Sequence, residues 1–166
     1  MKSVPFNEPA FTYAEVLDAT GVDNGWLRTL LQRDKSGRIG TKHRTGRLLF
    51  SLRDIAAIAV LWGLNSDLRI APAAAWEVVN AAEAILGKVA SPDFMKVEIH
   101  VAFADDSAVF VWRMDGDVIE TWSDAADERS HEVFFAARKA HIVIPMVSLF
   151  EPVAKAVTIA AKWEES

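Results

Sequence analysis

The chain has 166 residues, of which 51% are hydrophobic and 25% are charged, an ordinary composition for a globular protein of one domain or two small ones. It contains no cysteine, which excludes disulfides and thiolate metal sites. Its first residues include no apolar run of signal-peptide length, and no apolar segment is long enough to span a bilayer. We therefore expect a soluble, cytoplasmic protein without membrane contacts.

The charge is unevenly distributed. Residues 23–53 hold eight basic and two acidic residues and carry +6, whereas the other ten basic and twenty-one acidic residues leave the rest at −11. A basic segment in an acidic chain favours contact with a polyanion, and nucleic acid is the strongest candidate because phosphates supply most non-specific affinity. The basic residues of the segment are Arg28, Arg33, Lys35, Arg38, Lys42, Arg44, Arg47 and Arg53.

In chain order, the first element is a short helix over residues 11–19. Thr12 is placed to cap it, with Glu15 as the return partner of a capping box. Gly21 then suits a tight turn with positive φ, which a side chain would oppose. The pattern predicts a helix that stops abruptly and lets the chain turn at once into a second helix.

The second helix is predicted over residues 24–33, capped by Asp23. Its leucines lie at spacings i, i+3 and i+4 and share one face: Leu27, Leu30 and Leu31. The outward residues are then Asn24, Gly25, Arg28, Gln32, Thr29 and Arg33. Two short helices joined by a glycine turn, the second with a polar and basic outer face, are typical of a helix-turn-helix.

A small β-hairpin with a basic tip is predicted over residues 38–50, followed by a third helix over 52–64 that Ser51 caps. Such a hairpin would be a wing, placed along phosphates beside the groove that holds the second helix.

Residues 11–68 resemble the DNA-binding domain of MerR-type winged helix-turn-helix regulators of bacteria. The resemblance lies in Phe-Thr-Tyr-Ala-Glu-Val at 11–16, Thr-Gly-Val at 20–22, Leu-Arg at 27–28, Gly-Arg at 46–47 with Leu-Phe-Ser at 49–51, and the helix from Arg53 to Leu64. Thr29 and Leu30 stand where the family usually has an aromatic pair, and no long heptad helix follows. Excisionases share this architecture, so the resemblance does not separate transcription control from recombination.

The predicted DNA contacts come from the second helix and the wing. The helix would enter the major groove, and the wing would hold the phosphate backbone. The candidate DNA-binding residues are Asn24, Arg28, Thr29, Arg33, Arg38, Thr41, Lys42, His43, Arg44 and Arg47.

Downstream, a helix is predicted over residues 72–86 and a linker over 88–93, which divides the chain into domains 1–87 and 88–166. Alternation then predicts strands at 97–103, 108–114 and 117–123 as an antiparallel meander, with a further strand near 141–144. A last helix is expected to start at Ser148 or Glu151, and its stripe of Val153, Val157 and Ala160 is expected to pack on the sheet. The fold class is therefore α+β.

No catalytic or metal-binding pattern is present, so no cofactor is expected and an enzyme is disfavoured. Asp105 and Asp106 sit side by side in a turn, and His100, His131 and His141 lack close-ligand spacing. The six tryptophans are more typical of core or interface than of a ligand pocket.

We expect a sequence-specific DNA-binding transcriptional regulator that binds double-stranded DNA as a homodimer through its C-terminal domain. Two alternatives stay open. The chain could be an antitoxin or phage-type adaptor or excisionase whose C-terminal domain binds a protein partner. It could also respond to a small effector over which the sheet closes.

Overall fold

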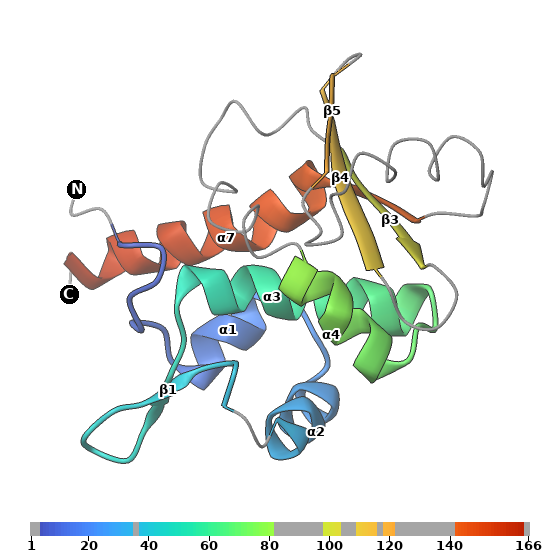
Figure 1. Cartoon of the computed structure of the whole chain (residues 1–166). Coiled ribbons are helices and arrows are strands. Elements are labelled where there is room, and N and C mark those ends of the chain that lie inside the picture. The colour runs from blue at the N-terminus through green and yellow to red at the C-terminus, as the bar shows by residue number, and fades with distance from the viewer. Residues whose placement is uncertain are drawn as a thin grey trace.

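The computed structural model describes residues 4–34, 37–81, 98–103, 109–115, 118–121 and 142–164. Helices occupy one side of the molecule and a sheet stands at the other, which confirms the α+β class (Figure 1). The first part contains α1 (Tyr13–Thr20), α2 (Asn24–Arg33), the hairpin of β1 (Thr41–Lys42) and β2 (Leu48–Leu49), α3 (Leu52–Trp62), one π-helical turn (Gly63–Asp67) and α4 (Pro72–Ala81).

The later part contains β3 (Glu98–Phe103), β4 (Val109–Asp115), β5 (Val118–Thr121), β6 (Ile142–Pro145), α7 (Met146–Ala161) and a final 3-10 turn (Lys162–Glu164). The four strands form one antiparallel sheet in the order β5-β4-β3-β6, so the predicted meander is confirmed and β6 extends it beside β3. The predicted linker at 88–93 and the end of the helix predicted to residue 86 lie outside the described residues.

Local end signals place α1 and α2 as predicted. The Thr12 side chain and Glu15 form the capping box of α1, and Gly21 ends the helix with φ +67°. The Asp23 carboxylate accepts a hydrogen bond from the Trp26 backbone N–H at 2.8 Å and so caps α2. Because both ends of the turn are fixed by short-range contacts, the angle between α1 and α2 is set by residues 20–23.

The helix α3 is the centre of the core, since it contacts α1, α4 and α7. Ser51 caps it, and the buried Asp54 carboxylate accepts from both the Ser51 N–H and the Ser51 hydroxyl at 2.9 Å. The helix is buried along most of its length at Leu52, Asp54, Ile55, Ala56, Ala57, Ile58, Val60 and Leu61. A helix that is apolar nearly all round must be covered on several sides, and the other helices supply that cover.

The last helix begins earlier than its sequence predicts. It starts at Met146 rather than at Ser148 or Glu151, and Pro152 lies inside it. A proline inside a helix removes one backbone hydrogen bond, and for this reason the sequence favours a start at Glu151, directly before Pro152. Burial of the apolar stripe of α7 offsets that loss.

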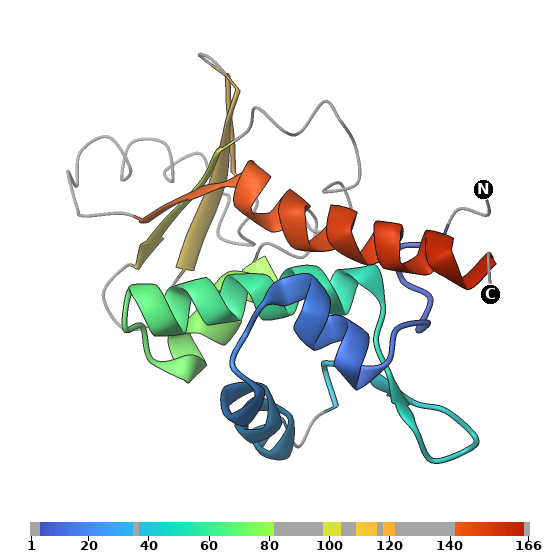
Figure 2. The same ribbon diagram turned by 180° about the vertical axis from the view of Figure 1, so that it is seen from behind.

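The expectation that α7 packs on the sheet is wrong. Val153, Ala156 and Ala160 are buried in the same core cluster as α1 and α3, and α7 lies across these two helices (Figures 1 and 2). Polar contacts reinforce the packing: the Lys155 ammonium lies 3.0 Å from the Asp18 carboxylate. The Trp163 indole N–H donates to Glu15 at 2.7 Å. The N-terminal helices and α7 therefore share one hydrophobic core.

This packing predicts a difference between two substitutions on α7. Val153 is 2% exposed, whereas Thr158 is exposed on the same helix. Val153→Ala removes two buried methyl groups and is expected to lower the free energy of unfolding by about 2 kcal/mol. Thr158→Ala is the matched control and should change it by no more than about 0.5 kcal/mol. Urea unfolding followed by circular dichroism measures both, and equal stabilities would contradict the shared core.

Candidate functional site

The outer face of α2 is polar and open to solvent. Leu27 and Leu30 bury the inner face, because they lie three residues apart on a helix of 3.6 residues per turn. Opposite them, Arg28, Thr29 and Gln32 are exposed. The sequence therefore predicts correctly which side of this helix is buried and which is exposed.

The start of α2 is tied to α1 by Tyr13. The Tyr13 hydroxyl is placed to donate to two oxygens of Asn24, the side-chain Oδ1 at 2.8 Å and the backbone oxygen at 3.1 Å. The Asn24 amide nitrogen makes no hydrogen bond within the described part of the chain. It is thus held at the surface with two N–H donors available to an acceptor.

Thr29 and Arg33 are also predicted to contact DNA, but Thr29 makes a hydrogen bond within the protein and Arg33 lines a pocket. The Thr29 hydroxyl donates to the Gly25 backbone oxygen one turn earlier at 2.9 Å, so that its proton is already used. Arg33 lies on the flank of α2 that faces α4 and lines a pocket there. Arg28 lies on the other flank, beside Tyr13, Leu31 and Gln32.

The hairpin tip is a tight turn that points its basic residues outward. The His43 backbone N–H donates to the Arg47 oxygen and the Gly46 N–H to the His43 oxygen, each at 2.8 Å. Gly46 has φ +80°, a conformation that favours glycine. The exposed residues of the hairpin are Thr41, Lys42, His43, Arg44, Thr45 and Arg47.

Arg38 stands apart from these tip residues. Its guanidinium lies 3.8 Å from the centre of the Trp76 ring, and its Nε lies 3.5 Å from the Asp34 carboxylate. Asp34 also accepts from the Ile39 N–H at 2.9 Å. Arg38 therefore joins the base of the hairpin to α4, while the tip residues remain available.

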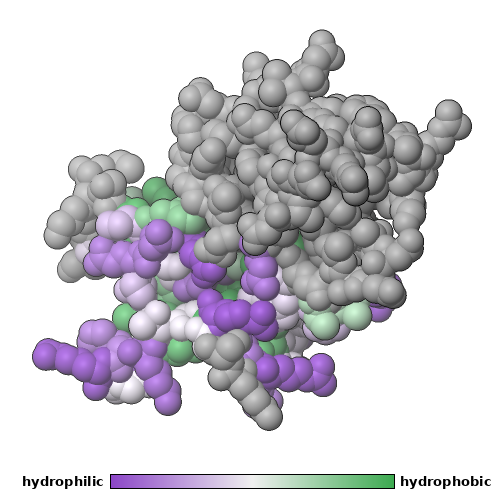
Figure 3. Space-filling model, in the orientation of Figure 1, coloured by the Kyte–Doolittle hydropathy of each residue, from purple (hydrophilic) through white to green (hydrophobic). Residues whose placement is uncertain are grey.

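The polar face of α2 and the hairpin tip project from the same end of the molecule. Both views place them on one side of α3, with α7 on the other (Figures 1 and 2). Hydrophilic residues gather over this end in the space-filling view (Figure 3). We call this surface the α2–hairpin face; it consists of Asn24, Arg28, Thr29, Gln32, Thr41, Lys42, His43, Arg44 and Arg47.

Two residues outside the predicted set also belong to this site. Gln32 lies near the middle of the exposed side of α2, between the angular positions of Arg28 and Thr29. Helical spacing alone indicates this position. Tyr13 orients Asn24 across eleven residues of sequence, and no short-range pattern indicates that contact.

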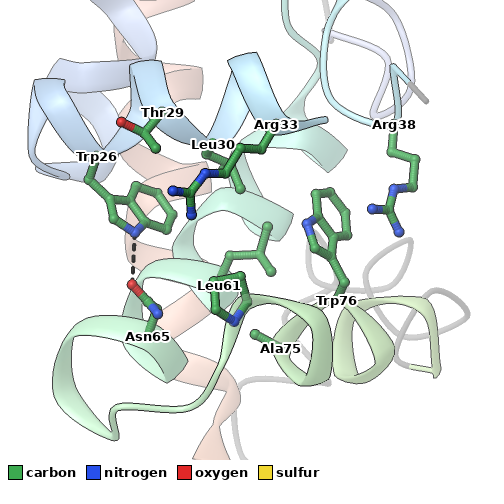
Figure 4. Close-up of a pocket in the computed structure, with 10 residues that line it drawn as sticks. Trp26, Thr29, Leu30, Arg33, Arg38, Leu61, Asn65, Ala75 and Trp76 are labelled. Carbon is green, nitrogen blue, oxygen red and sulfur yellow. Dashed lines mark hydrogen bonds between the residues drawn. The ribbon is translucent and has the colours of Figure 1, made fainter. Parts of the chain in front are cut away.

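A pocket of about 330 Å³ lies beside the α2–hairpin face, between α2, the end of α3 and the start of α4 (Figure 4). Trp26 is half-buried in its wall, where its indole N–H donates to Asn65 at 2.9 Å. The lining residues are Trp26, Thr29, Leu30, Arg33, Arg38, Leu61, Asn65, Pro72, Ala75 and Trp76.

The described residues contain no group of three or more His, Asp or Glu side chains that could hold a metal ion. Within the described ranges, no helix combines the length and apolar character needed to cross a membrane. No protein-family model matches the chain, and no curated protein is significantly similar to it.

Proposed function

We propose that residues 11–62 form a MerR-like winged helix-turn-helix that binds double-stranded DNA and regulates transcription. In this proposal α2 is the recognition helix and the β1–β2 hairpin is the wing. The observation that carries it is the position of α2 and the basic hairpin on the same side of α3, opposite α7 (Figures 1 and 2). A single stretch of duplex can then meet both at once.

The dimensions and charges of the face support this function. An α-helix with its side chains is about 10–12 Å across, which fits the major groove of about 12 Å. Asn24 and Arg28 offer hydrogen-bond donors from the exposed side of α2, and both residue types recognise base edges in the major groove. Lys42, Arg44 and Arg47 are exposed on the hairpin and would neutralise phosphates.

The rigid connection between helix and hairpin also supports it. Phe11 and Phe50 are fully buried and exchange two backbone hydrogen bonds of 2.9 and 2.8 Å, which join the start of α1 to the end of the hairpin. A face held in this way would lose little conformational entropy when it binds, which favours affinity.

We further propose that the protein binds DNA as a homodimer through residues 88–166. Among the described strands, β5 and β6 each pair on one side only and form the two edges of the sheet. Edge strands present unpaired backbone groups that can pair with a second copy. Helix-turn-helix dimers bind two half-sites about one helical turn of the duplex apart, so the proposed dimer requires two copies of α2 at that spacing.

The first prediction concerns salt. If each protomer neutralises about five phosphates, the logarithm of the association constant should fall with the logarithm of salt concentration at a slope of about −4 to −5, doubled for a dimer. Arg44→Gln removes one phosphate contact and should reduce the slope by about 1 per protomer on every sequence. Fluorescence anisotropy with a labelled duplex over a salt series measures both.

The matched control is Lys162→Gln, which removes an exposed cation in the 3-10 turn that follows α7, outside the α2–hairpin face. It should leave the slope unchanged. A flat salt response of the wild type, or equal effects of Arg44→Gln and Lys162→Gln, would refute the proposed binding face.

The second prediction concerns sequence recognition. Arg28→Gln should weaken binding to the preferred site by about 1–3 kcal/mol and relax the preference at one base position, because an arginine pairs with guanine through two hydrogen bonds. Its effect on a scrambled duplex should be smaller. Selection of preferred sites from a random duplex pool, with wild type and variant, gives the comparison. An unchanged preference would remove Arg28 from base recognition.

The third prediction concerns assembly. Light scattering during gel filtration of the full chain should give twice the mass of one chain at micromolar concentration. The mass of one chain at every concentration tested would contradict the homodimer. DNA binding by a single protomer would still be tested by the salt series.

A further inference from the structure

The pocket between α2 and α4 combines aromatic walls with cations. The Trp26 and Trp76 indoles line it together with Leu30, Leu61 and Pro72. Figure 4 shows the two indoles and the two leucines around the space. Arg33 and Arg38 add two guanidinium groups, and no acidic side chain is among the lining residues. A volume of about 330 Å³ falls within the usual size of small-molecule sites.

Most polar groups of the pocket are already paired. The Trp26 N–H donates to Asn65, and the Asn65 amide donates to the Ile70 oxygen at 3.0 Å. Thr29 donates to Gly25, and Arg38 is held by Asp34 and Trp76. These contacts fix the walls before any ligand enters.

Arg33 is the exception. Its guanidinium reaches over the pocket from α2 (Figure 4) and has no ion pair or hydrogen bond within the described residues. A planar guanidinium beside apolar walls is suited to a carboxylate, which it binds through two parallel hydrogen bonds.

We infer that this pocket binds a small aromatic carboxylate. The carboxylate pairs with Arg33, and the ring system lies among the indoles and the aliphatic side chains of Leu30 and Leu61. Aromatic rings stack favourably on indole, which adds to the gain from burying apolar surface. The site lies beside the α2–hairpin face and shares Thr29 of α2 with it.

The position of the pocket makes the carboxylate a regulator, and this step rests on the proposed DNA binding. A bound carboxylate neutralises Arg33 on the flank of the recognition helix, where DNA phosphates would otherwise meet that cation. The carboxylate should therefore weaken DNA binding about fivefold, at the low end of typical coupling between sites. By linkage, DNA should weaken carboxylate binding by the same factor.

The binding site is tested without DNA. Isothermal titration calorimetry of the full chain with 2-naphthoate should show binding in one site per chain, whereas its neutral analogue 2-naphthamide should bind about tenfold more weakly. Equal affinity for the two, or no heat of binding with millimolar 2-naphthoate, would overturn the inference.

Three variants locate the anion. Arg33→Gln should weaken 2-naphthoate binding about tenfold, whereas Arg33→Lys, which keeps the charge, should lose less. Arg28→Gln is the control on the opposite flank of α2 and should bind the probe as the wild type does. If Arg28→Gln weakens probe binding as much as Arg33→Gln, the site is wrongly placed.

A final measurement separates the two proposals. DNA affinity is measured by anisotropy with and without saturating 2-naphthoate, using 2-naphthamide as control. DNA binding that is insensitive to 2-naphthoate refutes the regulatory step and leaves the proposed function intact. Calorimetric binding of 2-naphthoate by a protein that shows no salt-dependent DNA affinity refutes the proposed function and leaves the carboxylate site intact.

Discussion

The hairpin and the first two helices keep a fixed relation because of the backbone bridge between Phe11 and Phe50. These residues are thirty-nine positions apart, yet their main chains exchange hydrogen bonds and both rings are completely buried. On one side the bridge leads into α1 and through Gly21 to α2. On the other it leads out of the hairpin into Ser51 and α3. The bridge adds a backbone connection to the buried core that Leu27 and Leu30 of α2 share with Ile39 and Phe50 on either side of the hairpin.

Short-range rules account for the parts of this arrangement that the sequence predicts well. Thr12, Gly21, Asp23 and Ser51 act on neighbours within a few residues, so their roles can be inferred without knowledge of the rest of the fold. The exposed and buried sides of α2 follow in the same way from helical spacing. Alternation in the sequence likewise indicates the antiparallel strands that the structure contains.

Long-range contacts explain what sequence reasoning could not find. The alternating small and branched residues of α7 fit any apolar surface, and nothing in them selects α1 and α3 over the sheet. The stacking of Arg38 on Trp76 joins positions thirty-eight residues apart. A charge count places Arg33, Arg38 and Arg44 in one basic group. Their surroundings in the structure distinguish them: Arg38 stacks on Trp76, Arg33 lines the pocket, and Arg44 is exposed on the hairpin.

The packing of α7 has a consequence for how the protein is made. A ribosome releases the N-terminal helices first, but Val153, Ala156 and Ala160 complete the core on which those helices rest. Trp163 then closes over Phe11, with ring centres 5.3 Å apart. During synthesis the first helices therefore keep apolar surface uncovered until α7 has emerged, and chaperones would meet them in that interval.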